Sequence, residues 1–317
     1  MAQHNNTMAE PFDAGWLKVP GGHRLYVEQR GRRDGLPVVL LHGGPGSGCA
    51  PAMASFFDAG RYRVILPDQR GAGRSRPRGA TAANTTAALL ADCERLRNAL
   101  CIDRWLLVGG SWGATLAVLY AAARREAVAG VLLRGLFLAR DADLEWFFGG
   151  AAALCPEAWQ NFAALAPAGT PALLPWLARA AAATAGWSRI ARAWWAWERA
   201  LAGLPAAPPP EGPALAALAA KYRLQTHYFR RRCFLRRDAV LEAMPRLAGL
   251  PTLLIHGRRD LVCRPESAWL ARRALPSARL QWVAGAGHDP YAPAMARAVS
   301  MAARRFATHG DFHGLGR

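Results

Sequence analysis

Short apolar runs recur along the chain, and most of them end in glycine-rich or polar turns. Helix-like stretches separate these runs, so strands and helices are expected to alternate. Strands that are buried on both faces read as continuous hydrophobic segments, which is typical of a parallel sheet covered by helices. The pattern therefore predicts an α/β fold with a mostly parallel central sheet flanked by helices. The predicted strands span residues 36–41, 62–66, 105–108, 131–133, 251–256 and 280–283.

The strand signal fades between residues 139 and 237, where Ala, Leu and Trp recur at helical spacing. This segment is expected to form a helical cap, inserted into a catalytic domain built from residues 1–138 and 238–317. Within it, the proline-rich stretch 205–213 is expected to be an exposed loop, because proline lacks an N–H and has a fixed φ. The 317 residues, 52% of them hydrophobic, can bury one large core.

The segment Gly109-Gly110-Ser111-Trp112-Gly113 lies between the predicted strand 105–108 and a helix-like stretch, 114–123. It is a G-x-S-x-G pattern in the strand–turn–helix context of a nucleophile elbow. Glycines suit a sharp turn that forces the central residue into a strained backbone conformation. Ser111 is therefore the predicted nucleophile, at the carboxyl end of a central strand. The alternative is an ordinary Gly-Ser turn that opens a helix.

A serine nucleophile needs a histidine base and a carboxylate that orients the histidine. Asp260 follows the strand 251–256 and His288 follows the strand 280–283, so both fall on loops at the same edge of the sheet as Ser111. Their order along the chain, Ser, Asp, His, is the order expected for such a hydrolase. The three residues are predicted to form a catalytic triad. The alternative for Asp260 is a turn or N-cap aspartate.

The glycine-rich segment 42–46, with the sequence HGGPG, follows the strand 36–41. It lacks the lysine of a P-loop and the spacing of a dinucleotide-binding fingerprint. Backbone N–H groups in such a loop can approach a substrate oxygen closely. Gly44 is therefore expected to supply one N–H group of an oxyanion hole and Trp112 the other. Asp68 and Arg70, in a later loop, are expected to form a structural polar pair.

Several motifs together resemble the proline iminopeptidase family of serine peptidases, and the similarity runs from about residue 15 to residue 306. The resemblance implies an α/β-hydrolase fold with a helical cap, and a peptidase that removes proline from the N-terminus of short peptides. It also implies that Ser111, Asp260 and His288 are the catalytic residues. The motifs are HGGPG at 42–46, DQRGAGRS at 68–75, NTT at 84–86, GGSWGATL at 109–116, LRGLFL at 133–138, WE at 197–198, HYF at 227–229 and HGRRD at 256–260.

The resemblance further implies that Glu198, in the cap, grips the free amino group of the substrate. The family usually has a second glutamate where this chain has Gln225, which keeps an acceptor oxygen but loses the charge. We therefore expect weaker binding of free amines and tolerance of uncharged substrates. Phe147 stands where relatives often carry tyrosine, so the acyl pocket is expected to be more apolar. Phe137 and Arg134 complete the expected substrate-binding residues.

Each of these substrate-site assignments has a structural alternative. Glu198 would otherwise be a solvated helix carboxylate near Arg192 and Arg199. Both phenylalanines would otherwise be core residues. Arg134 lies either under the active site or against the cap. Cys263, near Asp260, either lines the pocket or is a small buried hydrophobic residue.

The formal net charge is +18, and Lys18 and Lys221 are the two lysines. The arginines are dispersed through the predicted helices, which is typical of solvated faces and argues against a nucleic-acid-binding protein. One local cluster, Arg230-Arg231-Arg232 with Arg236 and Arg237, could attract anionic partners. The six cysteines have neither C-x-x-C spacing nor the density of a disulfide framework, so no metal is expected. No cofactor is expected either.

No apolar run is long enough to span a bilayer, and the segment 1–7 has no signal-peptide pattern, so a soluble cytoplasmic protein is expected. Two other functions stay open. One is an esterase or amidase of the same fold that acts on substrates without a free amine, which Gln225 would permit. The other is a basic binding protein that has lost hydrolytic activity. The sequence sets neither the oligomeric state nor the physiological substrate.

Overall fold

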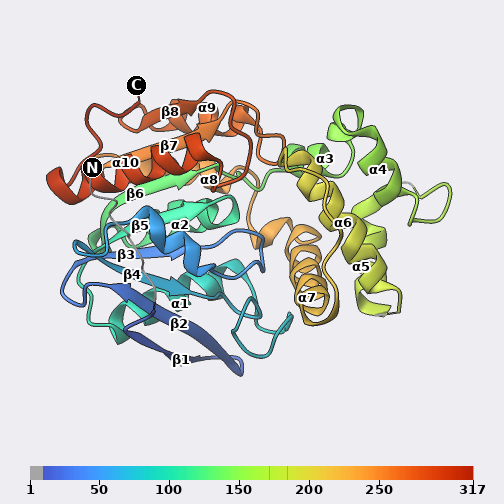
Figure 1. The fold of residues 1–317 in the computed structure, drawn as a ribbon, viewed down its shortest axis with the longest axis horizontal. Helices are drawn as coiled ribbons and strands as arrows, with labels where there is room; N and C mark the ends of the chain where they lie inside the picture. The colour runs from blue at the N-terminus through green and yellow to red at the C-terminus, as the bar shows by residue number, and fades with distance from the viewer. Residues whose placement is uncertain (1–9, 171, 184, 317) are drawn as a thin grey trace.

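The computed structural model describes residues 10–170, 172–183 and 185–316, which contain an eight-stranded sheet (Figure 1). Its strands lie in the order β1-β2-β4-β3-β5-β6-β7-β8. The six strands from β4 to β8 in this order are parallel, and β1 and β2 are antiparallel at one edge. The predicted α/β fold with a mostly parallel sheet is thus confirmed. The strands are β1 (Asp13–Val19), β2 (His23–Gly31), β3 (Leu36–Leu41), β4 (Tyr62–Pro67), β5 (Trp105–Gly110), β6 (Val128–Arg134), β7 (Thr252–Gly257) and β8 (Arg279–Val283).

Each apolar run predicted as a strand is one of the six parallel strands. The edge hairpin of β1 and β2 is missing from that prediction. Most side chains of β1 are exposed or half-buried, so its hydrophobic positions do not form a continuous run. The amino-terminal segment 1–7 lies outside the described residues.

Helices cover both faces of the sheet. Successive residues of β3 point to opposite faces, so Val38 packs in the same cluster as Phe306 of α10, whereas Val39 packs in the cluster that contains Leu116 of α2. The helices on the α10 side are α10 (Pro293–His309) and the short 3-10 helix at Pro51–Phe56. Those on the α2 side are α1 (Thr86–Ala99), α2 (Trp112–Ala123), α8 (Ala239–Ala243) and α9 (Pro265–Ala274).

Between β6 and β7 the chain forms a group of helices that stands to one side of the sheet (Figure 1). Aromatic side chains hold this group together, and the rings of Trp194 and Tyr222 are stacked with centroids 4.6 Å apart. The proline-rich loop lies between the last two helices, although the second of them begins at Gly212 because proline is tolerated in a first helical turn. The helices are α3 (Asp141–Phe147), α4 (Pro156–Ala163), α5 (Leu173–Ala183), α6 (Trp187–Leu201) and α7 (Gly212–Phe229).

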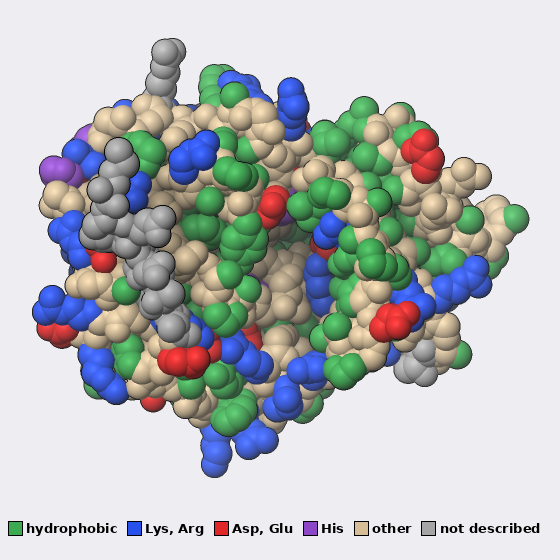
Figure 2. Space-filling model, in the orientation of Figure 1, with side chains coloured by type: hydrophobic (Ala, Val, Ile, Leu, Met, Phe, Trp, Pro, Cys, Tyr) green, Lys and Arg blue, Asp and Glu red, His purple; other side chains and the backbone are tan. Residues whose placement is uncertain are grey.

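Basic side chains are spread over the face of the molecule shown in Figure 2 and do not gather in one patch on it. A recess separates the sheet domain from the helices α3–α7 on this face (Figure 2). Among the described residues, no helix has the length and apolar character needed to cross a membrane.

Candidate active site

Ser111 lies at the turn between β5 and α2, with φ 55° and ψ −121°. A non-glycine residue with positive φ is strained, and the surrounding glycines make room for the turn. A Cβ atom on Gly113 would lie 1.8 Å from the carbonyl oxygen of Leu41, and one on Gly109 would lie 2.2 Å from the carbonyl oxygen of Gly113. Side chains at these two positions would therefore force the strand and helix apart. The turn has the strand–turn–helix geometry of a nucleophile elbow.

Asp260 and His288 come together from the loops after β7 and β8. His288 Nδ1 lies 2.7 Å from Asp260 Oδ2. An ionised carboxylate only accepts hydrogen bonds, so Nδ1 carries the proton and donates it to this contact. Nε2 is then the basic nitrogen of the imidazole ring, as a proton acceptor for a serine hydroxyl requires.

The carboxylate of Asp260 is fully buried, and four groups around it compensate for the loss of water. Burial alone would raise its pKa, but His288, the nearby ring of His256 and the backbone N–H group of Cys263 bring the pKa below its ordinary value. Oδ1 accepts hydrogen bonds from the backbone N–H groups of Val262, at 3.0 Å, and Cys263, at 2.8 Å. Asp260 is therefore held as an anion in one orientation.

The motif HGRRD also places His256 beside Asp260, a role that the sequence analysis did not assign. Its Nε2 lies 2.8 Å from the carbonyl oxygen of Cys263 and 3.7 Å from Asp260 Oδ2. Burial lowers the pKa of His256, so the ring is neutral and donates from Nε2 to the carbonyl oxygen. His256 thus braces the turn that carries Asp260. The four-residue spacing of His256 and Asp260 in the motif is the sequence signal for this contact.

Ser111 and His288 line one cavity of about 520 Å³, which the loops of the sheet and the helices α3, α6 and α7 enclose. Cys263 lines it as well, and its Sγ lies 3.7 Å from Ser111 Oγ. Burial raises the pKa of the Cys263 thiol well above its ordinary value, so the sulfur is protonated and a poor nucleophile. Both alternatives for Cys263 hold, since it is buried and faces the cavity.

The glycine-rich loop after β3 lies against the same cavity. Gly44 has φ +114°, and a Cβ atom there would lie 2.6 Å from the backbone nitrogen of Gly46 and 2.9 Å from that of Ser47. Only glycine fits this conformation without strain. Trp112 follows Ser111 as the first residue of α2, where backbone N–H groups have no acceptor within the helix. The assignment of the N–H groups of Gly44 and Trp112 as oxyanion donors stays a prediction.

His42 fixes the conformation of this loop. Its Nε2 accepts a hydrogen bond from the backbone N–H group of Gln69 at 3.0 Å. Its Nδ1 lies 2.9 Å from the carbonyl oxygen of Gly43 and 3.2 Å from the backbone nitrogen of Gly48. Burial lowers the pKa of His42 and keeps the ring neutral, as this pattern requires. The side chain of Gln69 returns a hydrogen bond from Nε2 to the carbonyl oxygen of His42 at 2.9 Å. Its Oε1 accepts from the indole N–H of Trp112 at 3.0 Å, which connects the two loops.

Arg134 ends β6 and lies under the active site. Its Nη1 donates to the carbonyl oxygen of His288 at 2.6 Å. Burial lowers the pKa of Arg134. Nearby negative groups act in the opposite direction, and the largest of these contributions comes from Asp260. A Cβ atom on Gly110 would lie 2.6 Å from Nη2, so a side chain at this position would displace the guanidinium group of Arg134. Arg134 lines the cavity, but its contact is with the loop that carries His288.

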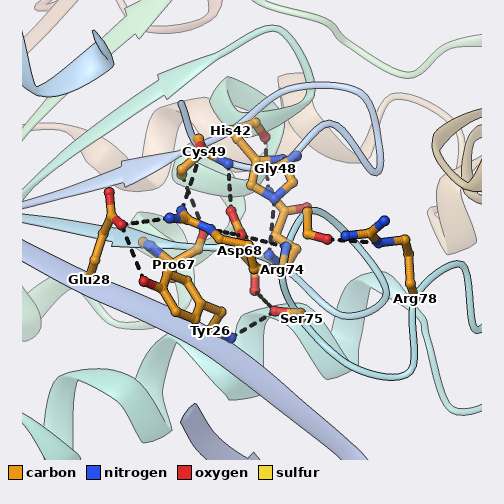
Figure 3. Close-up of polar contacts among 12 residues, drawn as sticks. Tyr26, Glu28, His42, Gly48, Cys49, Pro67, Asp68, Arg74, Ser75 and Arg78 are labelled. Carbon is orange, nitrogen blue, oxygen red and sulfur yellow. Dashed lines mark hydrogen bonds and ion pairs between the residues drawn. The ribbon is translucent and has the colours of Figure 1, made fainter. Parts of the chain in front are cut away.

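The expected pairing of Asp68 with Arg70 is wrong. Asp68 accepts from Arg74, through the backbone nitrogen at 2.8 Å and through Nε at 3.0 Å, and Arg74 continues to Glu28 at 2.6 Å (Figure 3). Arg70 instead forms a buried pair with Asp92 of α1, at 2.5 and 2.8 Å. The turn after β4 sends the side chains of Asp68 and Arg70 in different directions, which spacing along the sequence does not reveal. Both pairs are structural contacts of the loop.

Glu198, Gln225, Phe137 and Phe147 all line the cavity that contains Ser111. Both phenylalanines are largely buried as well, so they belong to the core and to the cavity wall. The expected neighbours of Glu198, Arg192 and Arg199, are not its partners among the described residues. Three other side chains contact its carboxylate instead, and all three come from α7: Lys221, Tyr222 and Gln225.

Lys221 Nζ lies 2.5 Å from Glu198 Oε2, and the hydroxyl group of Tyr222 donates to the same oxygen at 2.8 Å. Gln225 Nε2 lies 3.5 Å from Oε1. Neither Lys221 nor Tyr222 was predicted from the sequence to have a role. The sequence does contain a signal for Lys221. It lies one helical turn before Gln225 and therefore shares a face of the helix with it.

The described residues contain no group of three or more His, Cys, Asp or Glu side chains arranged to hold a metal ion.

The comparison with known proteins agrees with the fold. Residues 37–293 match the family model of the α/β hydrolase fold. Among solved structures, VinJ is 22% identical with a TM-score of 0.68, and the match covers 92% of this chain and 97% of that one. The esterase RhEst1 from Rhodococcus sp. ECU1013 is 23% identical with a TM-score of 0.62, over 93% and 98% of the two chains. The protein is an α/β hydrolase.

Similarity to curated proteins defines the family more closely. The proline iminopeptidase of Xylella fastidiosa strain Temecula1 is 42% identical over 292 residues, covering 89% of this chain and 93% of that protein. That of Xanthomonas citri is 41% identical over 304 residues, covering 94% and 97%. The proline iminopeptidase of Arabidopsis thaliana is 39% identical over 92% of this chain and 79% of its own length. The chain belongs to the proline iminopeptidase family.

Proposed function

We propose that the protein is a serine peptidase that releases proline from the N-terminus of short peptides. The observation that carries this proposal is the carboxylate of Glu198, which lines the same cavity as Ser111 and His288. A peptidase that recognises a free N-terminal amine needs a negatively charged group held at a fixed distance from the nucleophile. The names of the related proteins support the same activity.

In the proposed mechanism, Ser111 Oγ attacks the carbonyl carbon of the N-terminal prolyl residue, and its proton passes to His288 Nε2. Asp260 keeps the ring in the required tautomer and stabilises the imidazolium that forms. The oxyanion of the tetrahedral intermediate accepts hydrogen bonds from the N–H groups of Gly44 and Trp112. His288 then protonates the leaving amine. Water, deprotonated by the same nitrogen, hydrolyses the prolyl ester on the serine.

The cap supplies specificity in this proposal. We assign residues 139–237 to the cap and residues 1–138 and 238–317 to the catalytic domain, because the helices α3, α6 and α7 close the cavity over the sheet. Phe137 and Phe147 form the apolar wall that a pyrrolidine ring requires. Arg134 acts through the loop of His288. The cytoplasmic location stays a prediction from the sequence.

The test is hydrolysis of three substrates by the purified protein: a prolyl arylamide, its N-acetylated form, and a short-chain aryl ester. We expect the prolyl arylamide to be cleaved at a higher kcat/KM than the N-acetylated form, because only the free amine can pair with Glu198. Equal or better cleavage of the N-acetylated substrate would contradict the assignment. Hydrolysis of the ester alone would leave a serine hydrolase without the iminopeptidase activity.

Replacing Gln225 with glutamate is expected to lower KM for the prolyl arylamide several-fold, with kcat nearly unchanged. A second carboxylate would bind the ammonium in the ground state and in the transition state alike, and uniform binding appears in KM. Steady-state kinetics check this. Gln160→Glu, on an exposed position of α4, adds the same charge away from the cavity and should leave KM unchanged. An unchanged or higher KM in Gln225→Glu would show that this side chain does not face the amine.

A further inference from the structure

The carboxylate of Glu198 already has a cation bound to it. Lys221 Nζ lies 2.5 Å from Glu198 Oε2, and the two side chains are 18% and 23% exposed. The second donor to this oxygen, Tyr222, is fully buried and stacked on Trp194, so it fixes the carboxylate in place. The ion pair therefore joins the helices α6 and α7 at the wall of the cavity that contains Ser111.

An N-terminal amine would bring the same kind of group to the same carboxylate. With Gln225 uncharged, the anion of Glu198 and the cation of Lys221 sum to no net charge at the amine subsite. We propose that Lys221 competes with the substrate's ammonium group for Glu198 and so sets how strongly the enzyme prefers a charged N-terminus. This inference rests on the proposed iminopeptidase function. It makes Lys221 a specificity-determining residue of that site.

The hydrogen-bonding capacity around Glu198 shows where the substrate would bind. Oε2 accepts from Lys221 and Tyr222, whereas the contact of Oε1 is the long one to Gln225 Nε2, at 3.5 Å. The buried Oε1 of Gln225 has no hydrogen-bond partner among the described residues. A protonated prolyl nitrogen has two hydrogens. Glu198 Oε1 can accept one, and Gln225 Oε1 can accept the other once its side chain turns toward the cavity. In that arrangement, two cations share one carboxylate, and the repulsion between them weakens substrate binding.

The other charged groups at the cavity wall near Glu198 are engaged elsewhere. Asp143 of α3 pairs with Arg140 at 2.9 Å and with Arg264 at 3.6 Å. Arg199 of α6 donates to the carbonyl oxygen of Pro205 and lies over the ring of Trp195. Lys221 is thus the cation that competes directly for Glu198 within the described part of the chain.

Lys221 also affects the protonation of Glu198. Burial tends to raise the pKa of this carboxyl group, but Lys221, Tyr222 and Gln225 together bring it below its ordinary value. Without Lys221, the positive charge that opposes the effect of burial is gone, so the pKa of Glu198 rises. A carboxylate whose pKa is raised loses its charge at a higher pH as the solution is acidified. Protonation of His288 limits kcat/KM for esters and amines alike, so the acid limb that is specific to amine substrates should then move to higher pH.

The test compares Lys221→Met with the wild type on a prolyl arylamide and on a short-chain aryl ester, as a function of pH. Above the acid limb we expect KM for the prolyl arylamide to fall roughly tenfold with kcat nearly constant, because one competing charge interaction is removed. The acid limb should move upward, and KM for the ester should not change. Lys18→Met removes the other lysine of the chain, at an exposed position of β1, and should have none of these effects.

Two further variants keep the test decisive. Lys221→Arg retains a cation beside Glu198, so its KM for the prolyl arylamide should stay above that of Lys221→Met. Lys221→Gln is a second neutral variant if methionine prevents folding. A merely structural clamp between α6 and α7 predicts lower thermal stability with unchanged KM and an unchanged acid limb, and this result would overturn the inference. If the wild type does not cleave the prolyl arylamide at all, the result contradicts the proposed function and therefore also the inference.

Discussion

Replacing Ser111 with alanine is expected to lower kcat for a prolyl arylamide by about 10⁶-fold, the loss seen when the nucleophile of a serine peptidase is removed. Without Oγ no acyl-enzyme can form, so the remaining rate comes from water attack assisted by the oxyanion donors. Substrate binding should be nearly intact, because the groups proposed to bind the amine lie on α6 and α7. Initial rates at saturating substrate measure the effect.

The control is Ser188→Ala, an exposed serine of α6, which should retain the wild-type rate. Circular dichroism should show that Ser111→Ala is folded, since alanine occupies the strained position with a smaller side chain. Residual kcat within a hundredfold of the wild type in the folded variant would exclude Ser111 as the nucleophile.

Replacing Asp260 with asparagine is expected to lower kcat by about 10⁴-fold with little change in KM, through the tautomer of His288. Asparagine Oδ1 can still accept the backbone hydrogen bonds of Val262 and Cys263. Its amide NH₂ group, however, would face His288 Nδ1, which must then become the acceptor. The proton moves to Nε2, which can no longer take the proton of Ser111. The loss is therefore chemical and leaves the fold in place.

Steady-state kinetics and thermal unfolding of Asp260→Asn separate these effects. Asp103→Asn, at an exposed position before β5, is the matched control. A loss of less than tenfold would show that the pairing of Asp260 with His288 at 2.7 Å does not control the tautomer during the reaction. A large drop in stability with little change in specific activity would assign Asp260 a structural role only.

Much of the fold follows from patterns of local sequence. Strands buried on both faces are continuous apolar runs, and the run that ends at Val108 shows the start of the elbow as clearly as the glycines after it. The position of Ser111, Asp260 and His288 at one sheet edge follows from the topology of parallel strands. The β1–β2 hairpin does not stand out, because its exposed edge strand has no such run.

Pairings between side chains were harder to predict from the sequence than the fold. Arg70 binds Asp92, which is 22 positions away on another element, and Asp68 binds Arg74 across a turn. The contact of Lys221 with Glu198 depends on how α6 and α7 pack, and the sequence holds no signal for that packing beyond helical spacing. Residue types near a motif therefore indicate the chemistry, while tertiary packing decides which charges meet.

The helix α7 lies beside the glycine-rich loop and also carries the side chains around Glu198. A Cβ atom on Gly46, in the loop that contains Gly44, would lie 3.0 Å from Leu224 Cβ, and Leu224 is on α7 between the residues that surround Glu198. A side chain at position 46 would press on Leu224, so glycine lets this loop and α7 pack closely. Under the proposed function, the residues that bind the peptide's amine and the loop that polarises its scissile carbonyl therefore rest on the same helix.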